Sequence, residues 1–187
     1  MATASSRAEP VGAARPADRA VTVLYQSHYA ALVREAALLV GDVATAEDVV
    51  QDCFIALHRA WWRVRDHSTA LFYLRRSVIN KSRSVLRRRV VADRHPPLLA
   101  PELPSAEESA LAAEQRSSVL AALSAVRAAL RALPARQREV LVLRYYADLP
   151  ETQIAAVLGI SKGSVKVHAA RARDTLRAAL ADSGPST

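Results

Sequence analysis

Four side chains near the middle of the sequence have the types and the spacing to bind phosphate. They are Arg76, Asn80, Arg83 and Arg87, which follow one another at steps of four, three and four residues. Residues three or four apart share one face of an α-helix, and the segment 75–94 carries eight basic residues against one acidic residue. Basic side chains at this density bind backbone phosphates and make the affinity depend on salt. The pattern predicts a nucleic-acid contact, although the three arginines at 87–89 are also typical of a solvated helix end.

Aromatic side chains adjoin this basic helix. Four of the nine aromatic residues are Trp61, Trp62, Phe72 and Tyr73. Unpaired bases stack on aromatic rings while basic side chains hold the phosphates, so the combination indicates single-stranded nucleic acid. Trp61 and Phe72 also fit the apolar spacing of their helices, and for these two we favour a place in the hydrophobic core.

An acidic face precedes the basic helix in the sequence. Apolar residues at steps of three and four predict a helix that begins near Thr45, where Asp48 completes a capping-box pattern. The opposite face of that helix carries Asp48, Gln51 and Asp52. These side chains form either a solvated face or a docking surface, and a docking surface would take a protein because carboxylates repel phosphate. The residue pattern alone leaves both interpretations open.

The most specific motif lies in ETQIAAVLGISKGSVKVHAARARDTLRAAL. Ala155, Gly159 and Val165 have the spacing of a helix-turn-helix: a small residue where two helices cross, a glycine for the left-handed turn, and an apolar residue buried between the helices. Pro150 is expected at the first helical position before the motif, and Ser161 is expected to cap the second helix. An ordinary helical hairpin with a basic face is the alternative.

The second helix of this motif would present cations and hydroxyls to a DNA major groove. Its outward positions are Lys162, Ser164, Lys166, Val167, Ala170 and Arg171, with Arg173 further along. They start at the helix N-terminus, the end with which a recognition helix contacts base edges. His168 on the same helix is either a DNA contact or a packed surface residue.

The net charge of +8 is spread unevenly over the 187 residues. Segment 21–95 has twelve basic against seven acidic residues, and segment 119–187 has ten against five. Between them, 96–118 has one basic residue, four acidic residues and four of the nine prolines. Because proline removes a backbone donor and disfavours helix before it, this stretch is expected to be an extended linker.

Heavy use of Ala, Leu and Arg with only five Gly predicts an all-α fold. We expect two small helical domains joined by a flexible linker, the second a four-helix domain that contains the helix-turn-helix. The expected boundaries are a disordered tail at 1–19, a first domain at 20–92, a linker at 93–118, a second domain at 119–182 and a tail at 183–187.

Composition argues against several classes of function. A single Cys gives no disulfide framework and no cysteine zinc site, and the five histidines have no metal-ligand spacing. There is no phosphate-binding glycine loop, so we expect no cofactor and no catalytic residue. No run approaches the ~18 apolar residues of a membrane span, and the first residues lack the apolar core of a signal peptide. The expected location is the cytoplasm, without membrane insertion.

Three segments together resemble a known family. AEDVVQDCFIALHRAW, then YLRRSVINKSRSVLRRR and, after the proline-rich gap, LPARQREVLVLRYYADLPETQIAAVLGISKGSVKVHAARARDTLR are similar to bacterial sigma factors of the extracytoplasmic-function (ECF) subfamily of the sigma-70 family. The resemblance implies a transcription initiation factor, not an enzyme, that binds core RNA polymerase, directs it to specific promoters and assists promoter melting. It also implies that 20–92 is sigma region 2 and 119–182 is sigma region 4.

The resemblance also assigns roles to individual residues. The residues that match the motif docking on the β′ clamp of core polymerase are Asp48, Gln51 and Asp52, which makes docking the favoured interpretation of the acidic face. The residues implied to contact the −10 element are Asp66, His67 and Ser68 in the loop, and Arg76, Asn80, Lys81, Arg83 and Arg87 on the basic helix. The residues implied to contact the −35 element are Lys162, Ser164, Lys166, Val167, Ala170, Arg171 and Arg173.

The other partners that the resemblance implies are the polymerase β flap, promoter DNA and an anti-sigma factor. The sequence departs from the family pattern at Tyr73, where many members have Trp, and at Val167 and Ala170, where many have larger side chains. A free-standing helix-turn-helix regulator is the competing function. Such proteins usually dimerise on paired half-sites, but no spare apolar stripe indicates a dimer helix here, and the acidic helix would have no role.

Overall fold

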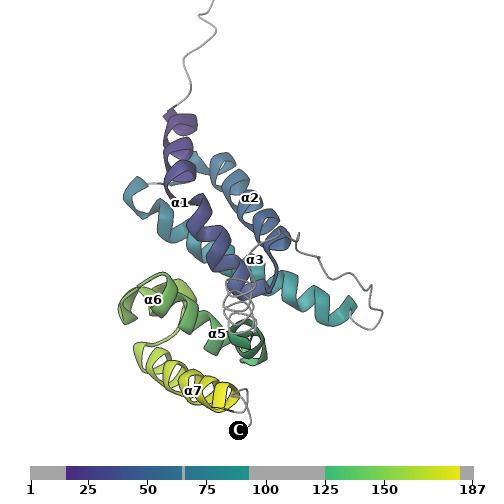
Figure 1. The fold of residues 1–187 in the computed structure, drawn as a ribbon. Helices are drawn as coiled ribbons and strands as arrows, with labels where there is room; N and C mark the ends of the chain where they lie inside the picture. The colour runs from purple at the N-terminus through teal and green to yellow at the C-terminus, as the bar shows by residue number, and fades with distance from the viewer. Residues whose placement is uncertain (1–15, 65, 93–124, 182–187) are drawn as a thin grey trace, which may run out of the picture.

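The computed structural model describes residues 16–64, 66–92 and 125–181, and the regular elements within these ranges are helical. Figure 1 shows them arranged as two helical units. We call 16–92 the N-terminal domain and 125–181 the C-terminal domain. The predicted all-α fold of two helical domains is confirmed. The predicted linker at 93–118 lies outside the described residues, as do 1–15 and 183–187 of the predicted tails. In the part of the chain that is described, no helix has the length and apolar character to cross a bilayer.

Three helices form the N-terminal domain. They are α1 (Pro16–Val40), α2 (Val43–Arg59) and α3 (Ala70–Ala92), with two short 3₁₀ turns, η1 (Trp61–Arg63) and η2 (His67–Thr69), between α2 and α3. Helix α1 begins at Pro16, so residues 16–19 are helical although they were expected in the tail. Apolar side chains from all three helices, such as Leu32, Val49 and Leu74, form the buried core.

The turn between α1 and α2 ends one helix and starts the next within two residues. Gly41 adopts a left-handed backbone with φ 96°, which glycine tolerates at no steric cost. Asp42 is the N-cap of α2, and its carboxylate accepts a hydrogen bond from the Thr45 N–H at 2.8 Å. The predicted helix start at Thr45 was therefore wrong, because Asp42 caps the helix through the Thr45 N–H and Thr45 lies within the first turn.

Two arginines fix α3 against α1. Arg75 donates to the Glu35 carboxylate through Nε at 3.0 Å and Nη2 at 2.9 Å, and the Glu35 side chain is only 4% exposed. Arg89 donates to the Val40 carbonyl at 3.0 Å and to the Asp42 carboxylate at 2.7 Å. Bidentate and charge-assisted bonds of this kind restrict orientation as well as distance. Arg89, part of the arginine run at 87–89, is therefore a structural residue.

The C-terminal domain contains the helix-turn-helix. Its elements are a helical segment at 125–132, α5 (Ala135–Leu141), η3 (Val142–Tyr146), α6 (Glu151–Leu158) and α7 (Lys162–Ala181). Element η3 is a π-helical turn in which the Ala147 N–H donates to the Val142 carbonyl at 3.0 Å. The helical stretch from Ala135 to Tyr146 is thus divided into α5 and η3. Pro150 is the N-cap of α6 and not its first helical residue.

The two domains pack against each other. Leu39 of α1 and Ile79 of α3 belong to the same buried apolar cluster as Val140 of α5 and Ile154 of α6. Figure 1 shows α5 and α6 beside α1 and α3, in agreement with the contacts between these helices. One apolar cluster therefore spans both domains.

We expect Glu35→Gln to destabilise the N-terminal domain by about 3 kcal/mol, because Arg75 loses its charged partner in a buried setting. Urea unfolding followed by Trp fluorescence measures this domain selectively, since Trp61 and Trp62 are the only tryptophans of the chain. The control is Asp18→Asn, which removes a carboxylate 40% exposed and should cost less than about 1 kcal/mol. Equal losses in the two variants would contradict the structural role of the Glu35–Arg75 pair.

Candidate nucleic-acid interface

Helix α3 carries five predicted −10 contacts along its length. They are Arg76, Asn80, Lys81, Arg83 and Arg87. The side chains of Arg76, Asn80 and Arg87 are exposed, whereas those of Lys81 and Arg83 are half-buried. Part of the predicted contact face of α3 is therefore open to solvent, and part of it is covered by neighbouring side chains.

Carboxylates hold the two half-buried cations among these predicted contacts. Lys81 pairs with Asp52 of α2, and Arg83 pairs with Glu139 of the C-terminal domain. Arg83 also donates to the Asn80 side-chain carbonyl at 3.1 Å. Two side chains predicted to contact DNA are thus joined to each other and to a carboxylate from the other domain.

The loop before α3 is shaped by its own hydrogen bonds. The Asp66 carboxylate accepts from the Ser68 N–H at 2.9 Å and from the Ser68 hydroxyl at 2.6 Å. The Thr69 hydroxyl donates to the Asp66 carbonyl at 2.7 Å. Such an Asx turn fixes the backbone of a short loop. Asp66 and Ser68 are exposed, and the side chain of His67 lies outside the described part of the structure.

The four aromatic residues near α3 divide between core and surface. Trp61 is 8% exposed and belongs to the N-terminal core, as predicted. Trp62 is 76% exposed, and the Arg63 guanidinium carbon lies 4.5 Å from its ring centroid. Tyr73 is 50% exposed and contacts Phe72 edge-on, while Phe72 is half-buried against the apolar cluster that spans both domains. Of the four rings, Trp62 and Tyr73 are therefore the two that can stack on an unpaired base.

The turn between α6 and α7 has the predicted geometry. Gly159 is left-handed, with φ 65° and ψ 41°, and the Ser161 hydroxyl accepts from the Ser164 N–H at 3.0 Å. Val165 is fully buried between the two helices, with Ile154 against it in the same cluster. The glycine turn, the serine cap and the buried valine of the predicted helix-turn-helix are all present.

Helix α7 exposes most of the predicted −35 contacts. The exposed ones are Lys162, Lys166, Val167, Arg171 and Arg173, and the half-buried ones are Ser164 and Ala170. His168 is half-buried, with Nδ1 buried and without a hydrogen-bond partner, which favours a packed residue over a DNA contact. The outward face of α7 is thus basic from its first turn.

Glu151 of α6 lies near the first two turns of α7. It accepts a hydrogen bond from Arg144 at 2.9 Å, and its other carboxylate oxygen lies 3.9 Å from Lys166 Nζ. The hydrogen bond from Arg144 holds the pKa of Glu151 below its ordinary value. The carboxylate is therefore ionised at neutral pH and faces a lysine of the recognition helix.

The acidic face of α2 is exposed and adjoins an aromatic surface. The exposed residues of this face are Asp48, Gln51 and Asp52. Beside them the rings of Tyr25 and Tyr29 stack at 4.4 Å, and Phe54 packs against Tyr25 at 5.1 Å. Tyr25 is 41% exposed, so part of this aromatic surface is open to solvent.

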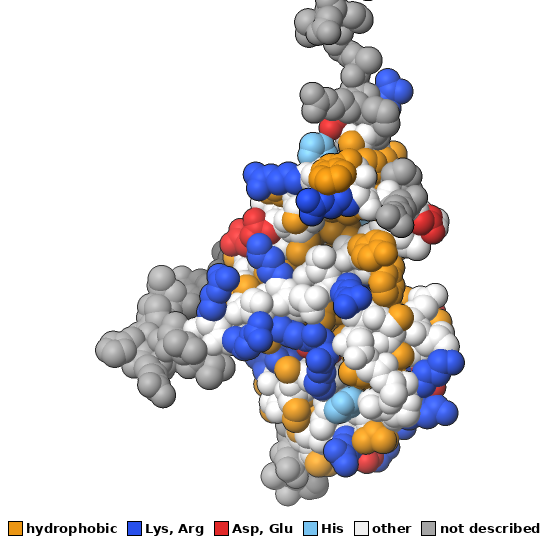
Figure 2. Space-filling view, turned by 180° about the vertical axis from the view of Figure 1, so that it is seen from behind, with side chains coloured by type: hydrophobic (Ala, Val, Ile, Leu, Met, Phe, Trp, Pro, Cys, Tyr) orange, Lys and Arg blue, Asp and Glu red, His pale blue; other side chains and the backbone are white. Residues whose placement is uncertain are grey.

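Basic side chains gather on one face of the molecule. Figure 2 shows the face opposite to that of Figure 1, where Lys and Arg form a band across the middle and acidic side chains are fewer. A surface of one sign raises the local concentration of a polyanion and speeds its association. This face suits nucleic acid.

Neither metal chemistry nor thiol chemistry has a basis among the described residues. Within them, no three His, Cys, Asp or Glu side chains are grouped to hold a metal ion. Burial raises the pKa of the Cys53 thiol to about 11, so the thiol stays protonated and unreactive at neutral pH.

Comparison with known proteins identifies the family. Residues 24–90 match the model of sigma-70 region 2, and residues 123–176 match that of sigma-70 region 4. The ECF RNA polymerase sigma factor SigL of Mycobacterium tuberculosis is 32% identical over 180 residues, across 92% of this chain and 96% of that protein. The chain belongs to the ECF group of the sigma-70 family.

Two further proteins illustrate how far the similarity extends. The probable RNA polymerase sigma factor RfaY of Xanthomonas campestris pv. campestris is 35% identical over 150 residues, which cover 73% of this chain but only 34% of that protein's length. The sigma factor RpoE, solved in complex with the anti-sigma factor NepR from Bartonella quintana, has the same fold with a TM-score of 0.66 at 23% identity, over 85% of this chain and 95% of that one.

As a sigma factor, the protein directs RNA polymerase to promoters in transcription initiation and is not an enzyme. The N-terminal domain contains region 2, and the C-terminal domain contains region 4. The match to region 2 decides against a free-standing helix-turn-helix regulator, which would need only a domain like region 4.

Glu139 is the residue of the sigma factor that sequence reasoning missed. It lies 56 residues after Arg83, on the far side of the linker, and accepts two hydrogen bonds from it. Helical periodicity relates residues within one helix and carries no information about such a pair. Its only signal in the sequence is a carboxylate within the otherwise basic segment 136–144.

Ser161→Ala should free the N–H groups at the start of α7 and destabilise that turn by about 1 kcal/mol, or roughly fivefold in local opening. Amide hydrogen exchange at Ser164, whose N–H loses its acceptor, measures the effect directly. Thr175→Ala is the matched control, since it removes a hydroxyl bonded to the Arg171 carbonyl within the same helix. The capping role of Ser161 is rejected if the two variants change exchange at Ser164 equally.

Proposed function

We propose that region 2 docks on core RNA polymerase through α2 and holds the melted −10 strand with α3, while α7 of region 4 contacts the −35 duplex. The observation that carries this proposal is the separation of charge within region 2: α2 exposes carboxylates and α3 exposes cations. Surfaces of opposite charge on one domain suit two different partners, a basic protein surface and a polyanion.

The docking surface combines charge with apolar area. The carboxylates of Asp48 and Asp52 are exposed on α2, and Ile55 on the same helix is 48% exposed. The stacked rings of Tyr25 and Tyr29 lie nearby on α1. Protein interfaces typically bury aromatic and apolar side chains within a polar rim. We propose the β′ clamp of the polymerase as the partner of this surface, and the β flap as the partner of region 4.

Promoter melting requires a place for unpaired bases. Taking a base out of the duplex costs a few kcal/mol, and each base that stacks on an aromatic side chain recovers about 1–3 kcal/mol. Trp62 and Tyr73 are exposed rings that suit this stacking. Arg76 and Arg87, exposed on α3, suit the phosphates of the separated strand.

Recognition of the −35 element would use the exposed face of α7. Lys162 and Lys166 lie in its first two turns, where cations suit phosphates. Arg171 is exposed further along and has the side chain that most often forms a bidentate contact with guanine. The two lysines would thus orient α7 on the duplex, and Arg171 would discriminate between DNA sequences.

One more partner and a location belong to the proposal. Because RpoE was solved with the anti-sigma factor NepR, we propose that an anti-sigma factor also binds this protein. We also propose that the protein acts in the cytoplasm, without membrane insertion, because its two main proposed partners are RNA polymerase and DNA.

Transcription in vitro tests the proposal as a whole. The purified protein, added to core RNA polymerase on a library of genomic fragments, should give run-off transcripts that start at defined positions. Core polymerase alone is the control and should not start there. If no fragment gave a defined start that depends on the protein, the proposal would be overturned.

We expect Asp48→Arg to weaken binding to core polymerase by roughly a hundredfold or more, because a like charge at a protein interface costs several kcal/mol. Asp48 is exposed, so the fold should be retained, as circular dichroism would verify. Asp174→Arg reverses a charge in region 4 that is 72% exposed and serves as the control. Titration of labelled protein with core polymerase gives both affinities, and undiminished binding of Asp48→Arg would remove α2 from the docking surface.

Arg171→Ala should reduce discrimination between the preferred −35 sequence and altered ones by about 1–3 kcal/mol, the value of a bidentate base contact. Competition gel shifts with the polymerase holoenzyme on promoter variants measure this difference. Arg177→Ala, which removes an exposed arginine paired with Asp174, is the control for loss of charge. An equal loss of affinity on every sequence would reassign Arg171 to a phosphate contact.

A further inference from the structure

We propose that the carboxylate of Glu151 competes with DNA phosphates for the cations at the start of the recognition helix. Glu151 then lowers the affinity of region 4 for DNA of any sequence, and the choice between sequences is left to Arg171. This inference rests on the function proposed for α7, because it concerns how α7 holds the −35 duplex. Glu151 is the first residue of α6, the helix that precedes α7 in the helix-turn-helix.

The carboxylate of Glu151 divides its two oxygens between cations of different elements. Oε1 accepts a hydrogen bond from Arg144 Nη1 of η3 at 2.9 Å, and Oε2 lies 3.9 Å from Lys166 Nζ of α7. The hydrogen bond from Arg144, and then the charges of Lys166 and Lys162, favour the ionised form and hold the pKa of Glu151 below its ordinary value. One carboxylate therefore faces three cations.

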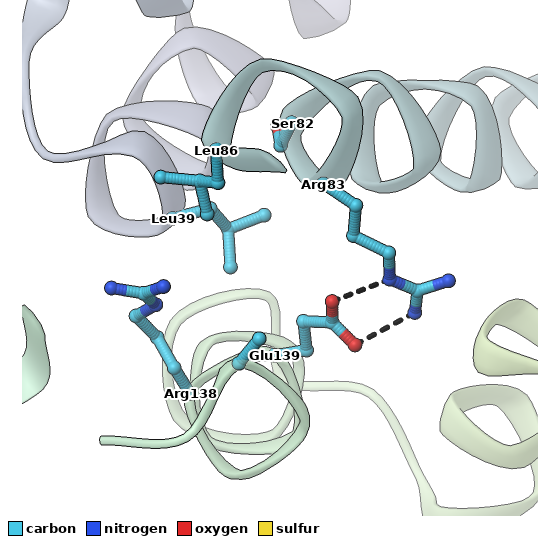
Figure 3. A pocket seen from close by; sticks show the side chains of 7 residues that line it. Leu39, Ser82, Arg83, Leu86, Arg138 and Glu139 are labelled. Atoms are coloured by element: carbon cyan, nitrogen blue, oxygen red, sulfur yellow. Dashed lines mark hydrogen bonds and ion pairs between the residues drawn. The ribbon is translucent and has the colours of Figure 1, made fainter. Parts of the chain in front are cut away.

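These ion pairs are open to a ligand. The exposed fractions of the Glu151, Arg144 and Lys166 side chains are 29%, 38% and 69%. By contrast, Glu139, which pairs with Arg83 where α3 meets α5, is 4% exposed (Figure 3). Ion pairs exposed to water add little to stability, so the fold does not depend on Glu151. Its cations stay within reach of a phosphate.

The Glu151 cluster lies where a helix-turn-helix meets DNA. In this motif the first helix crosses the DNA backbone, and the second helix begins in the major groove. Glu151 begins the first helix, α6, and Lys166 lies in the second turn of α7. The phosphates of a duplex held by α7 therefore approach the cations that Glu151 faces.

A phosphate at Lys166 would lie close to the carboxylate. A phosphate oxygen bonded to Lys166 Nζ at about 2.9 Å comes no further than about 7 Å from the nearer Glu151 oxygen, which is itself 3.9 Å from Nζ. Physiological salt screens charges only beyond about 8 Å. The two anions therefore repel each other, and each weakens the attraction of the other to the lysine.

The base contact proposed for Arg171 is affected less. The acceptors that guanine presents in the major groove are uncharged, so a carboxylate does not repel them as it repels a phosphate. Arg171 also follows Lys166 by five residues, about 7.5 Å further along the helix axis. Glu151 thus reduces the part of the affinity that comes from phosphates and leaves base discrimination unchanged.

The consequence is weaker binding to DNA that is not a promoter. Phosphate contacts supply essentially all of the affinity for such DNA, and it competes with the specific site in large excess. A carboxylate among the phosphate-binding cations lowers the fraction of the sigma factor held there. More of the protein then remains available to its specific partners.

Binding of a short duplex of non-promoter sequence to the full chain tests the competition. By fluorescence anisotropy, Glu151→Gln, which removes the charge and keeps the shape, should bind about tenfold more tightly than the native protein. The plot of log affinity against log salt should become steeper by about 0.9 for each phosphate gained. Asp174→Asn removes the same charge from α7 at a carboxylate that is 72% exposed and should change the affinity by less than about twofold.

A second variant shows whether Glu151 acts through the lysine. In a chain that already carries Lys166→Gln, Glu151→Gln should gain only about threefold or less, because one of the phosphate contacts that Glu151 opposes is gone. With the polymerase holoenzyme on promoter variants, Glu151→Gln should keep the native discrimination at the −35 element within about twofold. A loss of discrimination would make Glu151 a base contact and refute the competition.

The competition is also refuted if Glu151→Gln binds the duplex no better than Asp174→Asn, if the salt dependence stays the same, or if the gain is undiminished without Lys166. Lys166→Gln alone examines the underlying function: if it does not weaken duplex binding, α7 is not the DNA contact and both proposals fail. If it weakens binding while Glu151→Gln has no effect, only the competition fails. Polymerase takes no part in duplex binding, so the outcome of run-off transcription does not alter these results.

Discussion

A basic side chain attracts a carboxylate of its own chain and a phosphate of DNA by the same electrostatic interaction, and the two anions oppose each other. At the start of α7 the carboxylate is that of Glu151, which accepts a hydrogen bond from Arg144 at 2.9 Å and lies 3.9 Å from Lys166 Nζ. On α3, Lys81 pairs with Asp52. The positions of the carboxylates therefore decide how much of the net charge of +8 acts on DNA.

Other arginines have a structural role and hold the helices in place. The ion pair between Glu35 and Arg75 joins α1 to α3 entirely within region 2. The bonds from Arg89 to the Val40 carbonyl and to Asp42 do the same near the end of α3. The Glu35 side chain is only 4% exposed, so a phosphate does not reach it as it reaches an exposed pair. Basic residues of one helix thus divide between those that position it and those that remain available to DNA.

Features with a local cause were predictable from the sequence, and those set by distant partners were not. Gly159 is needed for a left-handed turn, and it has that conformation. The start of α2 was placed wrongly because Asp42 and Thr45 are both good N-cap residues, and a pattern cannot decide between them. In the structure Asp42 caps the helix and Arg89 binds both side chains. The Arg83–Glu139 pair joins residues 56 apart across the linker, where no periodicity applies.

The most direct measurement of the central claim is the pKa of Glu151 with and without DNA. NMR of the side-chain carboxyl carbon, assigned with the help of Glu151→Gln, gives this pKa for the free chain and for the chain bound to a short duplex. In the free chain the pKa should lie below its ordinary value, because Arg144 donates to the carboxylate. With the duplex bound the pKa should rise, because phosphates neutralise the neighbouring cations and repel the carboxylate. A pKa that the duplex leaves unchanged or lowers would contradict the account.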